Sequence, residues 1–63
     1  MIRENQKVRT LVEKDGFKIG TLGGVVSVYS SGPACEVKLW DENNYPVDVI
    51  TYRFDELSAV NED

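Results

Sequence analysis

Short runs of alternating apolar and polar residues, separated by turn-forming residues, recur along this chain. The clearest run extends from Ala34 to Trp40, where Cys35, Val37 and Leu39 alternate with small, charged and aromatic residues. Because successive side chains of a strand point to opposite faces, this alternation predicts a strand whose apolar set faces the core. The same parity places Trp40 on the polar face of that strand.

The same kind of pattern predicts four more strands, bounded by segments rich in Gly, Pro, Asp and Asn. These strands are expected at residues 7–12, 25–29, 47–52 and 58–60. Residues 53–57 are too few for a helix between strands and suit a single 3-10 turn. In the loop at residues 13–20, Phe17 and Ile19 are expected to tuck beneath the chain. The plan is that of a small all-β, five-stranded antiparallel SH3-like barrel with one short 3-10 turn before the last strand.

Three glycines, Gly20, Gly23 and Gly24, lie where the chain enters the second of these strands. They are expected to supply a positive φ or a bulge that bends a strand around a barrel corner. Unless a bulge resets the phase, Val26 and Val28 share one face of that strand and Val25 and Tyr29 share the other. A phosphate-binding loop is the rival interpretation, but the G-x-G-x-x-G and G-K-[ST] spacings are missing and no helix follows.

The length of 63 residues allows one domain. We expect a loosely held arm at residues 1–6, the barrel at residues 7–60 and an acidic tail at residues 61–63. The polar start of the chain does not resemble a signal peptide. No apolar run approaches the roughly 20 residues that span a bilayer.

Acidic residues outnumber basic residues by 11 to 7, which gives a net charge of −4. This balance argues against binding to nucleic acid or to anionic membranes, because both depend on positive charge. The single cysteine cannot form an intramolecular disulfide, which favours a cytoplasmic location.

Residues that commonly carry out catalysis or bind metals are scarce. Histidine is absent, so neither a histidine base nor a usual zinc ligand set is present. The thiol of Cys35 is expected to be buried and inert. Asp41 with Glu42, and Asp55 with Glu56, are sequence neighbours and are expected to be solvated rather than held across a cleft. The sequence therefore predicts a non-enzymatic protein with no catalytic residue, no cofactor and no metal site.

The aromatic residues are the strongest candidates for a binding surface. Phe17 and Phe54 have no polar group and are expected in the core, whereas one tryptophan and three tyrosines combine a large ring with a polar tip. Such rings either dock a partner or cap the open ends of a small barrel. The candidate partner-binding residues are Trp40, Tyr45, Tyr29, Tyr52, Asp41 and Arg53.

A resemblance to known families rests on a few short motifs. They are Lys7-Val8, Gly20-x-x-Gly23-x-Val25-Val26-x-Val28-Tyr29, Glu36-Val37 and Phe54-Asp55-Glu56-Leu57. From about Lys7 to Val60 the chain resembles a family of small bacterial proteins known as domain-of-unknown-function family 4926. The plan is also similar to the barrels of a small photosystem I accessory protein and of the ferredoxin–thioredoxin reductase variable chain, and more distantly to KOW-type barrels. The motifs are structural glycines and core valines, so the resemblance implies a fold and no chemistry.

The sequence favours a small protein-interaction module whose partner is another protein. By analogy alone, it would be an accessory or antitoxin-like partner of a larger bacterial protein. The alternative is a nucleic-acid-binding, KOW-like barrel, which exposed aromatics support and the negative charge opposes. We expect a monomer or a weak homodimer.

Overall fold

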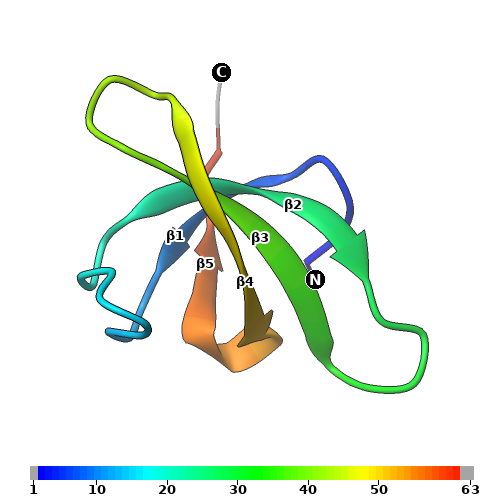
Figure 1. The fold of residues 1–63 in the computed structure, drawn as a ribbon. Coiled ribbons are helices and arrows are strands. Elements are labelled where there is room, and N and C mark those ends of the chain that lie inside the picture. The colour runs from blue at the N-terminus through cyan, green and yellow to red at the C-terminus, as the bar shows by residue number, and fades with distance from the viewer. Residues whose placement is uncertain (1, 62–63) are drawn as a thin grey trace.

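A computed structural model describes residues 2–61, which form one antiparallel sheet of five strands (Figure 1). The strands are β1 (Lys7–Thr10), β2 (Leu22–Val28), β3 (Ala34–Trp40), β4 (Pro46–Arg53) and β5 (Leu57–Ala59), with a 3-10 turn, η1 (Phe54–Glu56), before the last. Their order in the sheet is β4-β3-β2-β1-β5. The all-β class, the five antiparallel strands and the position of the 3-10 turn are confirmed. Within these residues no helix is long and apolar enough to cross a bilayer.

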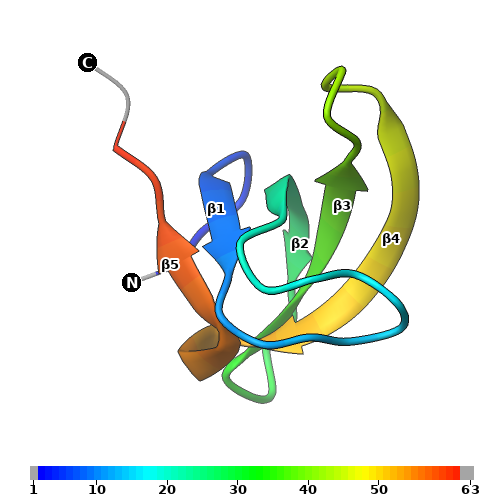
Figure 2. The same cartoon turned by 90° about the vertical axis from the view of Figure 1, so that its left-hand side faces the viewer.

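The sheet coils but does not close, so the strands expected to form a barrel form an open, coiled sheet. Among the described residues, β4 and β5 form the two edges of the sheet and do not pair with each other. They are joined only by η1, and Figure 2 shows the sheet curving around an opening between them. The long β1–β2 loop, residues 11–21, crosses this opening toward β4.

The core lies on the concave face of the sheet and confirms the parity predicted for β3. Cys35, Val37 and Leu39 are fully buried. They share a cluster with buried residues of the other strands and the N-terminal segment, namely Ile2, Val8, Val25, Tyr52 and Leu57. Full burial of an aliphatic side chain of this kind contributes about 1.5–3 kcal/mol, so these contacts are the main source of stability.

The N-terminal segment is packed against the sheet, in contrast to the loosely held arm predicted for residues 1–6. Ile2 is buried in the core cluster. The Asn5 N–H donates to the Val25 carbonyl at 2.9 Å, and the Val25 N–H donates to the Gln6 carbonyl at 2.9 Å. These two bonds continue the pairing with β2 into the residues that precede β1. Residues 62 and 63 of the predicted acidic tail lie outside the described part of the chain.

A bulge sets the phase of β2. The register between β2 and β3 shifts between Val25 and Ser27, so Val26 is an extra residue and its side chain is exposed. Val25 on one side of the bulge is buried, and Val28 on the other side packs against the core. The bulge therefore lets residues of both parities reach one core, which strict alternation would forbid.

Two glycines allow β2 and β3 to approach closely where the sheet coils. A Cβ atom on Gly23 would lie 2.6 Å from the Lys38 carbonyl oxygen, so no larger residue fits without moving the backbone. A Cβ atom on Gly24 would lie 3.3 Å from the Trp40 ring. The first glycine thus permits the strand contact, and the second leaves room for the indole on the opposite face.

The outer edge of β4 is partly blocked by side chains. Every second residue of β4 pairs with a core residue of β3, namely Asp48, Ile50 and Tyr52. The residues between them direct their backbone groups away from β3. The Val49 N–H donates to Asp48 Oδ1 at 2.8 Å, and Lys14 Nζ donates to the Thr51 carbonyl at 3.0 Å. Contacts of this kind limit pairing of a free edge with another chain.

The strand contact at Gly23 can be tested with two alanine variants. Gly23→Ala is expected to lower the free energy of unfolding by about 1–3 kcal/mol, because the new methyl group meets backbone at the closest point of the sheet. Gly32→Ala is the matched control, because a Cβ there has nothing within 4 Å. Its free energy of unfolding should stay within about 0.5 kcal/mol of the original. Urea unfolding measures both, and equal stability of the two variants would contradict the packing described.

Candidate functional site

A groove of about 670 Å³ lies between the β1–β2 loop and the hairpin that joins β3 to β4. One wall is formed by residues 16–22. The other is formed by the end of β3, the hairpin turn and the start of β4, through Trp40, Asp41, Glu42, Asn44 and Val47. We call it the Trp40 groove, after the largest side chain that lines it.

Trp40 is supported from the sheet and contributes its ring to the groove. The indole lies against Gly24, where a Cβ atom would lie a tight 3.3 Å from the ring. Lys7 Nζ lies 5.9 Å from the centre of the ring, at the outer limit of a cation–π contact. The side chain is half-buried, so support on one side leaves part of the ring accessible. Trp40 also borders a smaller hollow of about 300 Å³ near Asn5 and Lys38.

The hairpin turn holds Asp41 at the rim of the groove. Asp41 Oδ1 accepts the N–H of Asn43 at 2.8 Å and that of Tyr45 at 3.0 Å. Asn44 adopts a left-handed conformation with a φ of 66°, which asparagine adopts more readily than most residues. The carboxylate of Asp41 is therefore fixed by the turn that it organises.

The opposite wall is tied to the sheet through Thr10, a polar residue that is almost fully buried. Its hydroxyl donates to the Lys18 carbonyl at 3.1 Å and accepts the Thr21 N–H at 3.0 Å. The Thr21 hydroxyl donates to the same Lys18 carbonyl at 2.6 Å. Phe17, in the middle of this loop, packs against the core, as predicted. The wall is thus held by both hydrogen bonds and apolar contacts.

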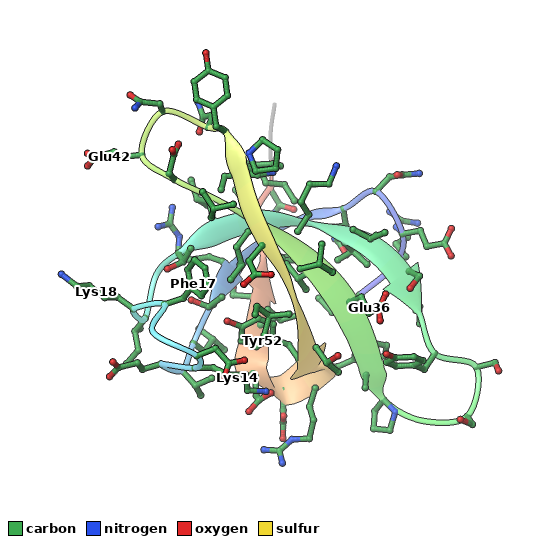
Figure 3. The ribbon with its side chains drawn as sticks, viewed as in Figure 1. Lys14, Phe17, Lys18, Glu36, Glu42 and Tyr52 are labelled. Atoms are coloured by element: carbon green, nitrogen blue, oxygen red, sulfur yellow. The ribbon has the colours of Figure 1, made fainter. Side chains whose placement is uncertain are left out.

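Lys14 fastens the loop across the opening of the sheet. Its ammonium donates to the Thr51 carbonyl and to Glu56 Oε1, each at 3.0 Å, and lies 4.7 Å from the centre of the Tyr52 ring. Figure 3 shows Lys14 directly beside Tyr52. The Glu56 side chain is only 12% exposed. The hydrogen bond from the Arg53 backbone N–H, followed by that from Lys14, lowers the pKa of Glu56 below its usual value.

The structure brings two of the six predicted contact residues, Trp40 and Asp41, into the groove. Tyr45 is 67% exposed on the neighbouring turn but does not line the groove. Tyr29 follows the far end of β2, and its hydroxyl donates to Glu36 Oε2 at 2.9 Å. Arg53 lies beside η1 and pairs with Asp55 at 3.1 Å. The predicted set is therefore spread over the molecule.

Tyr52 was predicted as an exposed contact residue, but the structure places it in the core. Its side chain is fully buried, because it stands opposite Cys35 on the core face of the sheet. Its hydroxyl has no hydrogen-bond partner among the described residues. Burial, reinforced by the charges of Asp15 and Glu56, raises the pKa of this hydroxyl. Tyr52 therefore stabilises the core and is not available to a partner.

Sequence reasoning missed the loop side of the groove. Ile19 was expected to tuck beneath the loop, but it is 67% exposed and lines the groove. Val47, at the start of β4, is 50% exposed and lines the opposite wall. The available signal was an isoleucine between glycines in a loop outside any alternating pattern.

Groups that carry out chemistry do not converge in this groove. Cys35 is buried under β3, and burial raises the pKa of its thiol. Within residues 2–61, no group of three or more His, Cys, Asp or Glu side chains is arranged to hold a metal ion. The groove instead presents apolar lining residues, two acidic residues on the hairpin and one lysine on the loop.

No protein-family model, curated protein or solved structure matches the chain. The class of the protein is therefore defined by its own architecture, a small all-β domain with one open, coiled antiparallel sheet.

The environment of Glu56 predicts a specific loss of stability in acid. Because its pKa is lowered in the folded state, Glu56 stabilises the fold fully only above its ordinary pKa of 4.5. This contribution should disappear as the pH falls from that value through the lowered folded-state pKa. Glu56→Gln should therefore lower the free energy of unfolding at pH 7 and make its decline toward low pH shallower.

Urea unfolding between pH 7 and pH 3 measures this effect. Glu42→Gln is the control, because Glu42 is exposed on the hairpin. Its stability should follow that of the unmodified protein at each pH. If the free energy of unfolding fell equally steeply toward low pH in the unmodified protein and in Glu56→Gln, the contacts assigned to Glu56 would be contradicted.

Proposed function

We propose that this protein is a non-enzymatic interaction module and that it binds a protein partner through the Trp40 groove. The observation that carries the proposal is the placement of Trp40. Its ring is supported by Gly24 beneath and faces a groove between two anchored walls. A large, rigid aromatic side chain in a preformed hollow is typical of the residues that dominate binding energy at interfaces.

Exposed apolar residues around the groove support the same function. Ile19 and Val47 line it, and Tyr45 stands on the adjoining turn, each at least half exposed. Surface apolar residues are normal singly, but a group of them rimmed by charge favours a contact surface. Trp40 with Ile19 and Val47 would form the apolar centre, and Lys18, Asp41 and Glu42 the polar rim.

The charge of this region favours a protein partner over the nucleic-acid alternative. Asp41 and Glu42 face one lysine, Lys18, among the lining residues, so the local balance is not positive. Nucleic-acid binding depends on clustered positive charge to neutralise phosphates. The resemblance to small bacterial barrels would make the partner a larger bacterial protein, and that narrower role is part of the proposal.

A display experiment tests the proposed function without a known partner. A random peptide library is selected on the immobilised protein alone, and the selected peptides are then measured against Trp40→Ala. Selected peptides should bind the original protein at least about 2 kcal/mol more tightly than the variant, the loss expected for a central aromatic contact. Tyr29→Ala is the control, because Tyr29 lies outside the groove. It should bind the same peptides unchanged.

The stability of Trp40→Ala separates this function from a purely structural role. Because the ring is only half-buried, its loss should cost less than the roughly 3–5 kcal/mol of a core aromatic truncation. Thermal melts should therefore show a folded variant. A largely unfolded Trp40→Ala, or selected peptides that bind it as well as the original protein, would show the proposal to be wrong.

A further inference from the structure

The two walls of the Trp40 groove carry opposite charge. Asp41 and Glu42 lie on the hairpin side, and Lys18 lies on the loop side. Figure 3 shows Glu42 and Lys18 extending from the two walls on the same side of the molecule. No ion pair joins these walls among the described residues, so the groove presents separated charges to an incoming ligand.

The acidic side is prepared to accept hydrogen bonds. One oxygen of Asp41, Oδ1, is occupied by two backbone N–H groups of the turn, which fix the orientation of the carboxylate. The other oxygen has no partner among the hydrogen bonds and ion pairs of the described residues, and the exposed Glu42 carboxylate beside it has none either. A fixed carboxylate next to an exposed one suits a donor that can bond to both.

The nearby edge of β4 is less suited to take a partner as an added strand. The Val49 N–H is occupied by Asp48, and the Thr51 carbonyl is occupied by Lys14. An added strand would have to displace both contacts before it could pair with those groups. Recognition by side chains within the groove is therefore favoured over recognition by backbone pairing.

We propose that the occupant of the Trp40 groove is an extended protein segment that places one arginine on the hairpin side, against Asp41 and Glu42, and a neighbouring apolar side chain against the apolar lining residues. This inference rests on the proposed function and specifies its ligand. A guanidinium is planar, donates in a fork that matches carboxylates and stacks on an indole, so arginine fits this corner better than lysine does. A cation over the face of an indole is attracted by the negative face of its π-system.

The charge of Lys18 limits which other residues the segment can carry. A second cation on the loop side of the groove would meet Lys18, so a uniformly basic segment is disfavoured. The bound segment therefore places its arginine on the hairpin side and a neutral or acidic residue on the loop side.

The test uses short, acetylated and amidated peptides of valine and threonine with one central arginine. The matched peptides replace that arginine with citrulline, which has nearly the same shape without the charge, with lysine or with glutamate. Binding is followed through the fluorescence of Trp40, the one tryptophan in the chain, and through backbone amide chemical shifts. The arginine peptide should bind at least about tenfold more tightly than the citrulline and glutamate peptides and severalfold more tightly than the lysine peptide.

Two variants of the protein locate the contact. Asp41→Asn keeps the oxygen that accepts the two N–H groups of the turn but removes the charge, and Glu42→Gln removes the neighbouring charge. Each should weaken the arginine peptide severalfold and leave the citrulline peptide unchanged. Glu4→Gln is the control, because it makes the same change in net charge outside the groove. It should leave both peptides unchanged.

The outcomes separate this inference from the proposed function. Equal binding of the arginine and citrulline peptides, no binding of any peptide at millimolar concentration, or shifts concentrated at Val49 and Thr51 would each overturn the arginine assignment. If display-selected peptides still required Trp40 but not Asp41 or Glu42, the interaction module would stand and the arginine assignment would fall. If no selected peptide required Trp40, both would fall.

Discussion

The close approach of β2 and β3 at Gly23 and Gly24 is the constraint on which the rest of the structure depends. A Cβ on Gly23 would lie 2.6 Å from the Lys38 carbonyl oxygen, so the strands can meet here only without a side chain. The same missing atom on Gly24 lets the Trp40 ring lie on the opposite face of the sheet. The two glycines therefore act on opposite faces of the sheet. Gly23 allows the core to pack on the concave face, and Gly24 makes room for the one tryptophan on the other face.

The open side of the sheet explains why the β1–β2 loop is so firmly anchored. Since β4 and β5 do not pair, the core would be accessible between them without a cover. Phe17 supplies apolar cover, while Thr10 and Lys14 satisfy polar groups of the loop, of β4 and of η1. Isolated surface ion pairs contribute little, but Lys14 combines an ion pair, a backbone acceptor and an aromatic face at one partly buried position. The groove is a consequence of this arrangement, because the loop that covers the core also faces the β3–β4 hairpin.

The parts of the fold that could be predicted from sequence are those with one unambiguous alternation. The pattern of β3 placed Cys35, Val37 and Leu39 in the core, and the structure agrees. In β4 both parities are apolar, with Val47 and Val49 on one and Ile50 and Tyr52 on the other, so only the register with β3 shows that Tyr52 is buried. Ile2 was missed because an apolar residue at the start of a polar segment shows no period. Two residues of the groove, Trp40 and Asp41, were candidate contact residues from the sequence, but the groove itself was not predicted. Ile19 reaches them only through the course of a long loop.

The contact between the Trp40 indole and Gly24 supports both the fold and the proposed groove, and solution NMR tests it directly. Ring carbons Cζ2 and Cη2 lie closest to the position that a Gly24 Cβ would occupy, so the α-proton in that direction lies against the face or edge of the ring. We expect nuclear Overhauser effects between these indole protons and the Gly24 α-protons, together with a ring-current shift of the Gly24 α-protons that is absent in Trp40→Ala. An indole with no such effects to Gly24 and unperturbed Gly24 α-protons would contradict the seat of Trp40, and with it the groove as described.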